Sequence, residues 1–564
     1  MTYLETYEQW LKSVKDSSLL QELESIKGDD AQIKERFFYD LPFGTAGLRG
    51  IIGAGIARMN RYVVGRATQG LADYLKKSGK PDLRMVIAYD SRQFSREFAV
   101  EAACVFAGNG IKACLFKQLT SVPELSFAVG YYKADGGIVI TASHNPKDYN
   151  GYKVYASYGG QLGPEESLSV MECIQSLDAF RDVKRVDLAQ GIEQGLICEV
   201  GDEIDDAYYR HITELCGSDS AEGFKVVYTP LHGSGLRTAQ NVFPAAGIRD
   251  FYIVEAQKQP DGLFPTVKSP NPEDPSAMKM AIELAGQVGA EIAIGTDPDA
   301  DRMGAAVRRA DGRFEMLSGN QIGCLLIDYL LRKRQAAGTL KATDYVIRSF
   351  VSTDMVEEIA QEYGVVCHTV LTGFRFISEI IAQNEGTDKK FVFGFEESYG
   401  FLAGTFARDK DGVLAGLLLC KAAQHYRAQG KGLLDVLDEL YEKYGHFRER
   451  VKNIAFAGLD GMEKMQALMK KLRENPVTDI AGVPVACVED YQSRKRTFAD
   501  GTVTDIELPD TNALKLLLDG GGWICIRPSG TEPKIKIYFA VRGADADDAD
   551  RQLAQLEDGF ETLI

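Results

Sequence analysis

The sequence predicts an α/β protein of four domains, three related α/β domains followed by a smaller α+β domain around a central cleft. Three observations predict this fold. Apolar runs rich in Val and Ile alternate with helical stretches in three successive units. Each unit ends in an apolar run and a polar loop. The last part of the chain departs from this pattern, and 564 residues are enough for about four domains.

The first element is helical. Leu4, Tyr7, Leu11 and Val14 recur at helical spacing, so residues 1–40 are predicted to form helices. The predicted divisions of the chain are residues 1–210, which include this helical extension, then 211–320, 321–443 and 444–564.

Each of the three units begins and ends with a strand-like run. Continuous apolar runs between helical stretches are typical of buried, largely parallel strands. The opening runs are Arg84–Tyr89, Phe224–Tyr228 and Tyr345–Ile347, and the closing runs are Gly136–Thr141, Glu291–Gly295 and Lys390–Phe395.

A polar loop follows each closing run: residues 142–150, 296–302 and 396–400. In open α/β sheets, ligands bind beyond the carboxyl ends of the strands. The three loops are therefore expected to line one cleft. Residues 444–564 instead have short strand-like runs around one marked loop, Arg527–Lys534.

Composition narrows the functional classes. The chain has 64 Lys and Arg against 81 Asp and Glu, a formal net charge of −17. This balance disfavours a nonspecific nucleic-acid binder or a basic membrane-surface protein, but it leaves room for anionic small molecules in a local basic pocket. The N-terminus does not resemble a signal peptide, and no apolar run approaches the roughly 20 residues of a membrane span. Ten scattered cysteines without a C-x-x-C pair are typical of reduced thiols in a cytoplasmic protein.

The first candidate site is the loop Thr141–Pro146 (TASHNP). Ser143 directly follows a buried strand, so its hydroxyl is expected at a strand tip, as a nucleophile or phosphate carrier. His144 and Lys153 are titratable groups close by in the sequence. The alternative is an ordinary turn, because Ser, Asn and Pro are turn formers.

The second candidate site is Asp297–Arg302 (DPDADR). Three carboxylates at Asp297, Asp299 and Asp301 are costly to hold together without a cation, and oxygen ligands suit a hard ion such as Mg²⁺. The loop lacks the glycine and the later Glu of an EF-hand. The alternative is a solvated acidic turn.

Two further loops carry recognition groups. In Gly394–Gly400 (GFEESYG), carboxylates and a hydroxyl could bind sugar hydroxyls, although a helix N-terminus would look similar. In Arg527–Lys534 (RPSGTEPK), the Arg527 fork and the following small residues could cradle a phosphate, although a hairpin with a chance arginine is possible.

A fifth segment, Phe43–Gly50 (FGTAGLRG), is glycine-rich and contains Arg49, which could reach an anion. It matches neither the P-loop motif nor G-x-G-x-x-G. The alternative is a flexible loop. Taken together, the five segments indicate transfer of a phosphoryl group between a serine and a phosphorylated sugar, assisted by a divalent ion.

With these motifs, the chain resembles the α-D-phosphohexomutase superfamily, which includes phosphoglucomutases and phosphomannomutases. The motifs TASHNP, DPDADR, GFEES and RPSGTEP occur in the family's order, and with FGTAGLRG they extend from residue 43 to about 540. The FGTAGLRG segment, the N-terminal extension and the length are most similar to the phosphoglucomutase-2/phosphopentomutase branch.

The resemblance implies a heart-shaped four-domain fold and a phosphoserine at residue 143. That phosphate would pass to a hexose monophosphate, giving glucose 1,6-bisphosphate as intermediate and activator. One Mg²⁺ would be held by the three aspartates and the Ser143 phosphate. His144 and Lys153 would assist proton transfer, and Arg49 would stabilise the moving phosphoryl group.

The remaining implied roles concern the substrate. Arg302 would lie beside the reaction centre, and Glu396 and Ser398 would bind sugar hydroxyls. The E-E-S form is similar to that of glucose-specific relatives. Groups implied to hold the sugar and its distal phosphate are Thr372, Gly373, Lys410, Arg527, Ser529, Gly530 and Thr531. Some relatives carry His where Phe374 stands, which leaves the second acid/base group unassigned.

The expected activity is therefore a cytoplasmic phosphoglucomutase acting on sugar phosphates, as a monomer or dimer, with no nucleic acid or membrane partner. Alternatives within the superfamily are a phosphopentomutase or a phosphomannomutase. Outside it, a serine-dependent sugar phosphatase and a noncatalytic sugar-phosphate sensor are possible. A second phosphate site disfavours the phosphatase, and the intact Ser143 and aspartates disfavour the sensor.

Overall fold

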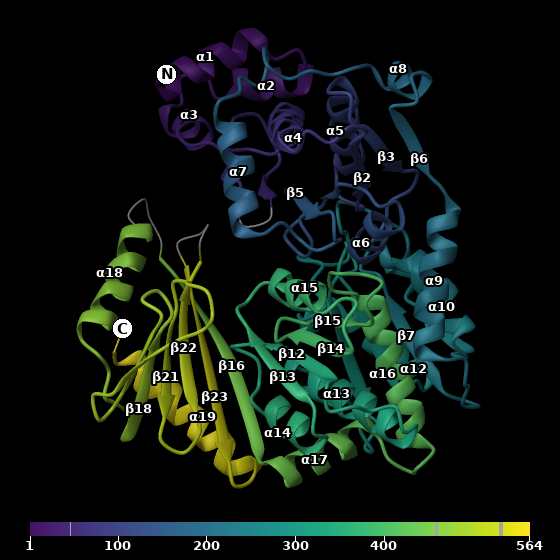
Figure 1. The fold of residues 1–564 in the computed structure, drawn as a ribbon, viewed down its shortest axis with the longest axis vertical. Helices are drawn as coiled ribbons and strands as arrows, with labels where there is room; N and C mark the ends of the chain where they lie inside the picture. The colour runs from purple at the N-terminus through teal and green to yellow at the C-terminus, as the bar shows by residue number, and fades with distance from the viewer. Residues whose placement is uncertain (45–46, 457–460, 530–533, 564) are drawn as a thin grey trace.

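The computed structural model describes residues 1–44, 47–456, 461–529 and 534–563. Four β-sheets follow one another along the chain (Figure 1). We call the parts built on them the first domain (α1 to β6), the second (α9 to β11), the third (α13 to α17) and the last (β16 to α19). The predicted α/β fold with three related domains and a distinct last domain is confirmed.

The chain begins with three helices, α1 (Tyr3–Ser13), α2 (Ser17–Ser25) and α3 (Asp30–Phe37). A capping box of Thr2 and Glu5 starts α1. The prediction that residues 1–40 form helices is confirmed, although Leu4 of the repeated apolar positions is 45% exposed. Trp10, next to Tyr7 on the buried face, packs instead against the body of the first domain.

The first domain has a six-stranded sheet in the order β1-β5-β4-β2-β3-β6. Helices pack on both of its faces (Figure 1). Its elements are β1 (Gly47–Ile51), α4 (Arg61–Lys76), β2 (Arg84–Tyr89), α5 (Ser95–Gly108), β3 (Lys112–Phe116), α6 (Val122–Tyr131), β4 (Gly136–Ile140), β5 (Tyr149–Ala156), α7 (Pro164–Gln175), α8 (Leu188–Glu193) and β6 (Ile197–Val200).

The second domain has the sheet β11-β10-β9-β7-β8 and the third has β13-β12-β14-β15. The second comprises α9 (Asp202–Cys216), β7 (Lys225–Thr229), α10 (Gly235–Ala245), β8 (Asp250–Ile253), α11 (Glu255–Lys258), α12 (Pro275–Val288), β9 (Ile292–Thr296), β10 (Met303–Arg308) and β11 (Phe314–Leu317). The third comprises α13 (Gly319–Ala336), β12 (Tyr345–Ser349), α14 (Met355–Glu362), β13 (Val366–Val370), α15 (Phe374–Gln383), β14 (Phe391–Glu396), β15 (Gly400–Ala403), α16 (Gly412–Arg427) and α17 (Leu433–Tyr444).

The three α/β domains share one four-strand arrangement. The orders β5-β4-β2-β3, β10-β9-β7-β8 and β15-β14-β12-β13 correspond strand by strand. In each, three strands are parallel, and the fourth runs back antiparallel beside the closing strand. The prediction of largely parallel strands is confirmed for the opening and closing runs, whereas the antiparallel return strands were not predicted. The return strands β5, β10 and β15 are mostly buried on both faces, so they lack the alternation that marks a half-exposed antiparallel strand.

This arrangement places the three candidate loops. Each predicted loop joins a closing strand to its antiparallel return strand, so the chain reverses within a few residues. Each reversal contains one non-glycine residue in the left-handed region: Ser143 (φ 51°), Ala300 (φ 55°) and Tyr399 (φ 64°). Such backbone conformations are costly and cluster at functional sites.

The last domain is built on an eight-stranded, antiparallel sheet, and its strands are longer than predicted at both β16 and β23. It comprises β16 (His446–Ala455), α18 (Gly461–Glu474), β17 (Asp479–Ile480), β18 (Val483–Asp490), β19 (Lys495–Phe498), β20 (Val503–Asp505), β21 (Leu514–Leu518), β22 (Trp523–Pro528), β23 (Lys534–Gly543) and α19 (Ala546–Glu561). Figure 1 shows it beside the third domain, coloured from green to yellow.

Two kinds of core hold these parts together. One hydrophobic cluster runs through the first three domains, including Phe127, Tyr228 and Leu414. A smaller cluster joins the last domain to the third, with Phe350 and Leu371 packed against Trp523. In the described part of the chain, no helix combines the length and apolar character needed to cross a membrane.

Candidate active site

The Ser143 loop meets the aspartate loop. Ser143 Oγ donates a hydrogen bond to Asp297 Oδ2 at 2.5 Å, although 154 residues separate the two in sequence. The same oxygen lies 3.1 Å from His144 Nδ1. Ser143 is only 3% exposed. The first and second domains thus bring the predicted hydroxyl and the predicted metal-binding loop into direct contact.

Ser143 is held by a chain of hydrogen bonds behind it. Its backbone N–H donates to Thr141 Oγ1 at 2.8 Å, and the Thr141 hydroxyl donates to Asp90 Oδ2 at 2.6 Å. Asp90 is fully buried, and burial raises the pKa of its carboxyl. These hydrogen bonds hold the strained backbone of Ser143 on the side of the loop that faces the sheet.

A buried arginine holds the loop from the other side. Arg92 Nη1 donates to the carbonyl oxygens of Pro146 (2.9 Å) and Tyr149 (3.0 Å). Its Nη2 donates to the carbonyls of Ser143 (2.5 Å) and Asn145. A planar fork of donors suits this task, and Lys could not replace it. Sequence reasoning missed Arg92, because its partners lie more than 50 residues further along the chain.

The aspartate loop gathers three carboxylates. Asp297, Asp299 and Asp301 each place an oxygen within 4.8 Å of the others, and all three are buried. Asp297 Oδ1 accepts the backbone N–H of Arg302 at 2.9 Å. Burial, and then the neighbouring carboxylates, raise the pKa of Asp297.

Two of these carboxylates have unused ligand atoms. Asp299 Oδ1 and Asp301 Oδ1 are buried and accept no hydrogen bond from any residue in the described ranges. A buried carboxylate oxygen without a partner is costly. A hard divalent cation prefers oxygen ligands of this kind. The residues present therefore fit a Mg²⁺ site, with the three aspartates as ligands.

Two lysines from different domains contact the same carboxylates. Lys153 Nζ on β5 lies 2.8 Å from Asp299 Oδ2 and 3.0 Å from Asp301 Oδ2. Lys410 Nζ from the third domain lies 3.3 Å from Asp301 Oδ2. Burial opposes ionisation of Asp301, but these two ammonium groups outweigh it and lower the pKa of Asp301. Three domains thus converge on one charge cluster.

His144 is enclosed with the serine. Its backbone carbonyl accepts a hydrogen bond from Ser269 Oγ at 2.6 Å, which ties the loop to the second domain. Burial, reinforced by the positive charges of Arg302 and Arg49, lowers the pKa of His144 well below its usual value. The imidazole is therefore neutral and can accept a proton.

Two predicted arginines flank this centre. Arg49 on β1 donates from Nη1 to Asn145 Oδ1 at 3.0 Å, so it lies beside the serine loop. Arg302 Nη1 donates to Glu273 Oε1 at 2.5 Å, and its backbone pairs with Gly400 of the third domain. The aspartate loop and the loop at residues 396–400 are therefore neighbours.

The third domain brings Glu396 and Gly373 together. The Gly373 N–H donates to Glu396 Oε1 at 2.6 Å, and Gly373 has a φ of 118°, which favours glycine. Thr372 and Ser398 are half-buried nearby in sequence. The second carboxylate of the motif, Glu397, turns away and accepts from Ser349 Oγ at 2.9 Å. Burial raises the pKa of Glu397.

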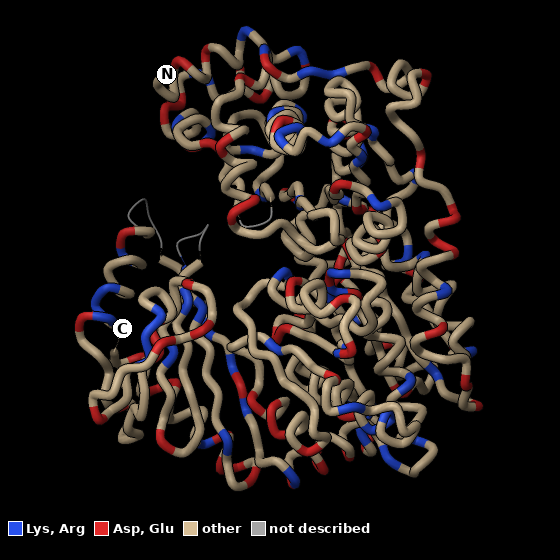
Figure 2. The backbone as a smooth tube through the Cα atoms, viewed as in Figure 1, with Lys and Arg blue, Asp and Glu red and all other residues tan. Residues whose placement is uncertain are grey.

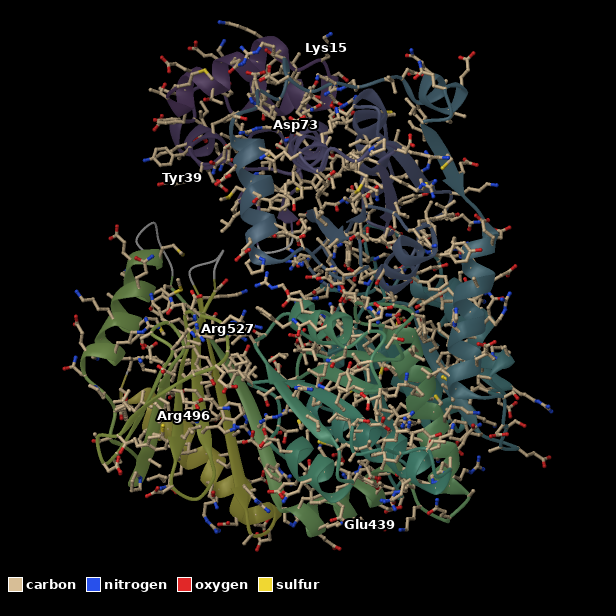
Figure 3. The ribbon with its side chains drawn as sticks, viewed as in Figure 1. Lys15, Tyr39, Asp73, Glu439, Arg496 and Arg527 are labelled. Atoms are coloured by element: carbon tan, nitrogen blue, oxygen red, sulfur yellow. The ribbon has the colours of Figure 1, made fainter. Side chains whose placement is uncertain are left out.

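The last domain presents basic residues toward the other domains. Figure 3 labels Arg527 at the end of β22 that faces the other domains, and its register partner on β23 is Lys536. Burial lowers the pKa of Lys536 and also that of Arg375 on α15, and the charge of Arg527 adds to both shifts. The positive charge of Arg527 is therefore close enough to repel those of Lys536 and Arg375. An anionic ligand would relieve their repulsion.

Ser529 is the other predicted residue of this loop that is described, and its N–H donates to the Lys534 carbonyl at 2.8 Å. Gly530 and Thr531 lie outside the described residues. Figure 2 shows acidic and basic residues interspersed along the chain. The chain as a whole carries a net charge of −17, so the group of basic residues around Arg527 differs from the average charge of the protein.

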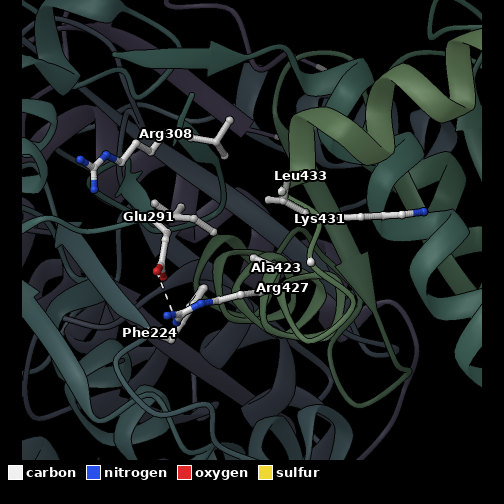
Figure 4. Close-up of a pocket in the computed structure, with 11 residues that line it drawn as sticks. Phe224, Glu291, Arg308, Ala423, Arg427, Lys431 and Leu433 are labelled. Atoms are coloured by element: carbon white, nitrogen blue, oxygen red, sulfur yellow. Dashed lines mark ion pairs between the residues drawn. The ribbon is translucent and has the colours of Figure 1, made fainter. Parts of the chain in front are cut away.

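Two cavities lie away from these residues. One of about 370 Å³ is lined by Glu291, Arg308 and Arg427, with an ion pair between Glu291 and Arg427 (Figure 4). It opens at the start of β9, and the aspartate loop follows the other end of that strand. Another of about 610 Å³ lies in the first domain, beside Arg61 and Arg185. Neither is lined by a predicted site residue.

Comparisons with known proteins agree with this geometry. Residues 40–181, 206–312 and 318–444 match the family domains described as phosphoglucomutase/phosphomannomutase, alpha/beta/alpha domains I, II and III. Residues 462–558 match the C-terminal domain of the same description.

Two similar relatives are phosphoglucomutases. That of Staphylococcus saprophyticus is 36% identical over 96% of this chain and 98% of its own length. That of Staphylococcus haemolyticus is 39% identical over 95% and 96%. The fold is similar to the open form of parafusin, a phosphoglucomutase from Paramecium, with a TM-score of 0.68, 17% identity, and coverage of 92% of this chain and 94% of that one.

Proposed function

The chain belongs to the phosphoglucomutase/phosphomannomutase family, and we propose that it interconverts α-D-glucose 1-phosphate and glucose 6-phosphate. The observation that carries this proposal is the 2.5 Å contact between Ser143 Oγ and Asp297. It joins a nucleophilic hydroxyl to a site suited to Mg²⁺. The choice of glucose is supported by relatives that are named phosphoglucomutase and that match nearly the full length of this chain.

In the proposed reaction, Ser143 carries a phosphate. A hydroxyl of the bound sugar phosphate attacks phosphorus, the bond to Ser143 Oγ breaks, and glucose 1,6-bisphosphate forms. The sugar hydroxyl loses its proton and the Ser143 oxygen gains one. After the bisphosphate reorients, Ser143 Oγ attacks the other phosphate and loses its proton. The bond between that phosphorus and its sugar oxygen breaks, the sugar oxygen takes up a proton, and the isomeric sugar monophosphate leaves the phosphorylated serine.

The residues around Ser143 have defined tasks in this scheme. His144 Nδ1, 3.1 Å from Ser143 Oγ, takes or returns the serine proton. Lys153 keeps its charge beside the aspartates, because Asp299 and Asp301 raise its pKa despite burial. Arg49 and Arg302 add positive charge where negative charge develops on the phosphoryl group.

One Mg²⁺ would be held by Asp297, Asp299 and Asp301 together with the phosphate on Ser143. When bound, the ion would supply electrostatic stabilisation to the transferring phosphoryl oxygens. The unpartnered oxygens of Asp299 and Asp301 support this assignment.

The substrate has two ends, and the chain offers a separate set of groups for each. Glu396 and Ser398 are proposed to bind sugar hydroxyls, with Thr372, Gly373 and Lys410 beside them. The distal phosphate would contact Arg527 and Ser529, and Gly530 and Thr531 by resemblance. A phosphatase has no need for a second cationic group of this kind. The chemistry is expected in the cytoplasm, where the ten free thiols would remain reduced.

The test is an assay of the purified chain with Mg²⁺ and a trace of glucose 1,6-bisphosphate. We expect glucose 1-phosphate to become glucose 6-phosphate without release of inorganic phosphate. Ser143→Ala should abolish the conversion, and Ser176→Ala, which removes an exposed hydroxyl of the same domain, is the control. If ribose or mannose phosphates turned over faster than glucose phosphates, the chain would instead be assigned as a phosphopentomutase or a phosphomannomutase. Phosphate release without isomerisation would contradict it.

A further inference from the structure

Two cysteines face each other across neighbouring strands of the first sheet. Cys114 on β3 and Cys198 on β6 are register partners in a parallel pair, so their side chains point to the same face. Their sulfur atoms lie 3.2 Å apart. Adjacent strands are about 4.8 Å apart, which lies within the Cα separations of about 4.4–6.8 Å that disulfides span. A bond between these sulfurs therefore requires no shift of either strand.

The two thiols differ in their surroundings. Cys114 is buried, whereas Cys198 is partly exposed because β6 is the edge strand of the sheet. The hydrogen bond between the sulfurs, with help from Lys112 and Arg84, lowers the pKa of Cys198 to about 6. The same hydrogen bond and burial raise the pKa of Cys114. The more exposed sulfur is therefore the one that ionises more readily.

We propose that Cys198 and Cys114 form a dithiol site that peroxides oxidise to an intramolecular disulfide. The Cys198 thiolate attacks one oxygen of hydrogen peroxide, takes up that oxygen as a sulfenic acid and releases water once a proton is supplied. The Cys114 thiol then attacks the sulfenic sulfur, its proton leaves with the hydroxyl as a second water, and the S–S bond forms. Peroxide is reduced and the two thiols are oxidised.

The position of the pair gives the bond a structural consequence. From β6 the chain enters α9, whose Tyr208 and Ile212 pack in the core shared by the first three domains. The segment between the two cysteines includes the Ser143 loop. A disulfide would tie the edge strand, and with it the connection to the second domain, to β3, the next strand of the sheet. Closing so long a loop stabilises a fold chiefly by restricting its unfolded state.

The other cysteines provide controls. Among the residues that the structure describes, Cys114 and Cys198 are the cysteine pair with a sulfur–sulfur contact. Cys173 on α7 is also partly exposed. It shares the accessibility of Cys198 but not its partner.

The experiment treats the reduced full-length protein with a small excess of hydrogen peroxide, blocks remaining thiols and maps peptides without reduction. We expect a cross-linked peptide pair containing Cys114 and Cys198, lighter by two hydrogen atoms and reversed by a dithiol reductant. The oxidised protein should unfold at a higher temperature than the reduced one. Cys173→Ser should leave the cross-link unchanged, and Cys198→Ser should abolish it.

A second variant separates the two roles. In Cys114→Ala, dimedone should trap a sulfenic acid at Cys198, because no resolving thiol remains. Should that variant fail to fold, alkylation of the wild-type protein at pH 7 decides, and Cys198 should react faster than Cys173. The proposal would be overturned by peroxide taking Cys198 to a sulfinic acid without a cross-link, or by Cys173 reacting first. These readouts do not depend on the proposed mutase activity.

Discussion

The proposed reaction centre around Ser143 and the proposed distal phosphate region around Arg527 are built in different ways. At the reaction centre, three domains share one hydrophobic core, and their charged side chains interlock around the aspartates. The last domain instead rests on the third through a smaller apolar cluster and polar contacts such as Lys515 Nζ to the Phe350 carbonyl, at 2.8 Å. The proposed chemistry thus lies where three domains are packed together, whereas the proposed site for the second phosphate lies on a domain joined to the others by a smaller contact.

The largest expected effect is at the nucleophile. Ser143→Ala should reduce mutase activity by more than about ten thousandfold, because no group remains to carry the phosphate. The circular dichroism spectrum and melting temperature should stay close to those of the wild type. A well-folded variant that still turns over would show that the chemistry lies elsewhere.

The next effect concerns the metal ligands. Asp299→Asn removes a charged ligand and should lower kcat by about a hundredfold or more, with a matching loss of Mg²⁺ affinity. Asp206→Asn, an exposed carboxylate on α9, should leave both unchanged. Excess EDTA should abolish wild-type activity, and added Mg²⁺ should restore it. Full activity in EDTA would contradict the metal site.

Arg92 tests whether the serine loop must be held rigidly. Arg92→Lys keeps the charge but loses the fork that binds the loop carbonyls, so kcat should fall by about ten- to a hundredfold. The free energy of unfolding should fall by about 2–4 kcal/mol, because buried acceptors lose their donors. The exposed Arg96→Lys is the control. Unchanged kcat in a destabilised Arg92 variant would assign this residue to stability alone.

Arg527 tests the other region. Arg527→Ala should raise KM for glucose 1-phosphate by about tenfold, because one phosphate loses a charge-assisted partner. Phosphorylation of Ser143 should remain possible. Arg496→Ala, in the same domain but paired with Glu489, serves as the control (Figure 3). An unchanged KM would remove Arg527 from substrate binding.

The smallest effect is at the attachment of the last domain. Trp523 Nε1 donates to Asp354 Oδ2 of the third domain at 2.8 Å. Trp523→Phe should lower the free energy of unfolding by about 1 kcal/mol and change kcat by less than about twofold. Calorimetry and steady-state kinetics check both. A large fall in kcat would show that this contact positions more than the last domain.

Much of this site was predictable from the sequence, because its residues lie in short motifs at strand ends. Ser143, Asp297 and Glu396 each stand at the end of an apolar run, which is where ligands bind in α/β sheets. What the sequence did not reveal depends on contacts between distant segments. Arg92 is in no recognisable motif, and its partners come close to it only in the folded chain. The divergence of Glu396 and Glu397 likewise follows from the antiparallel return of β15.

The central claim, that Ser143 relays a phosphate beside the aspartate cluster, is tested most directly by phosphopeptide mapping during turnover. The protein is incubated with glucose 1,6-bisphosphate labelled in its phosphates, quenched and digested, and a second sample is chased with unlabelled glucose 1-phosphate. We predict label on the peptide containing Ser143 and its transfer to sugar phosphate during the chase. Label on another residue, or full turnover with none on this peptide, would contradict the account.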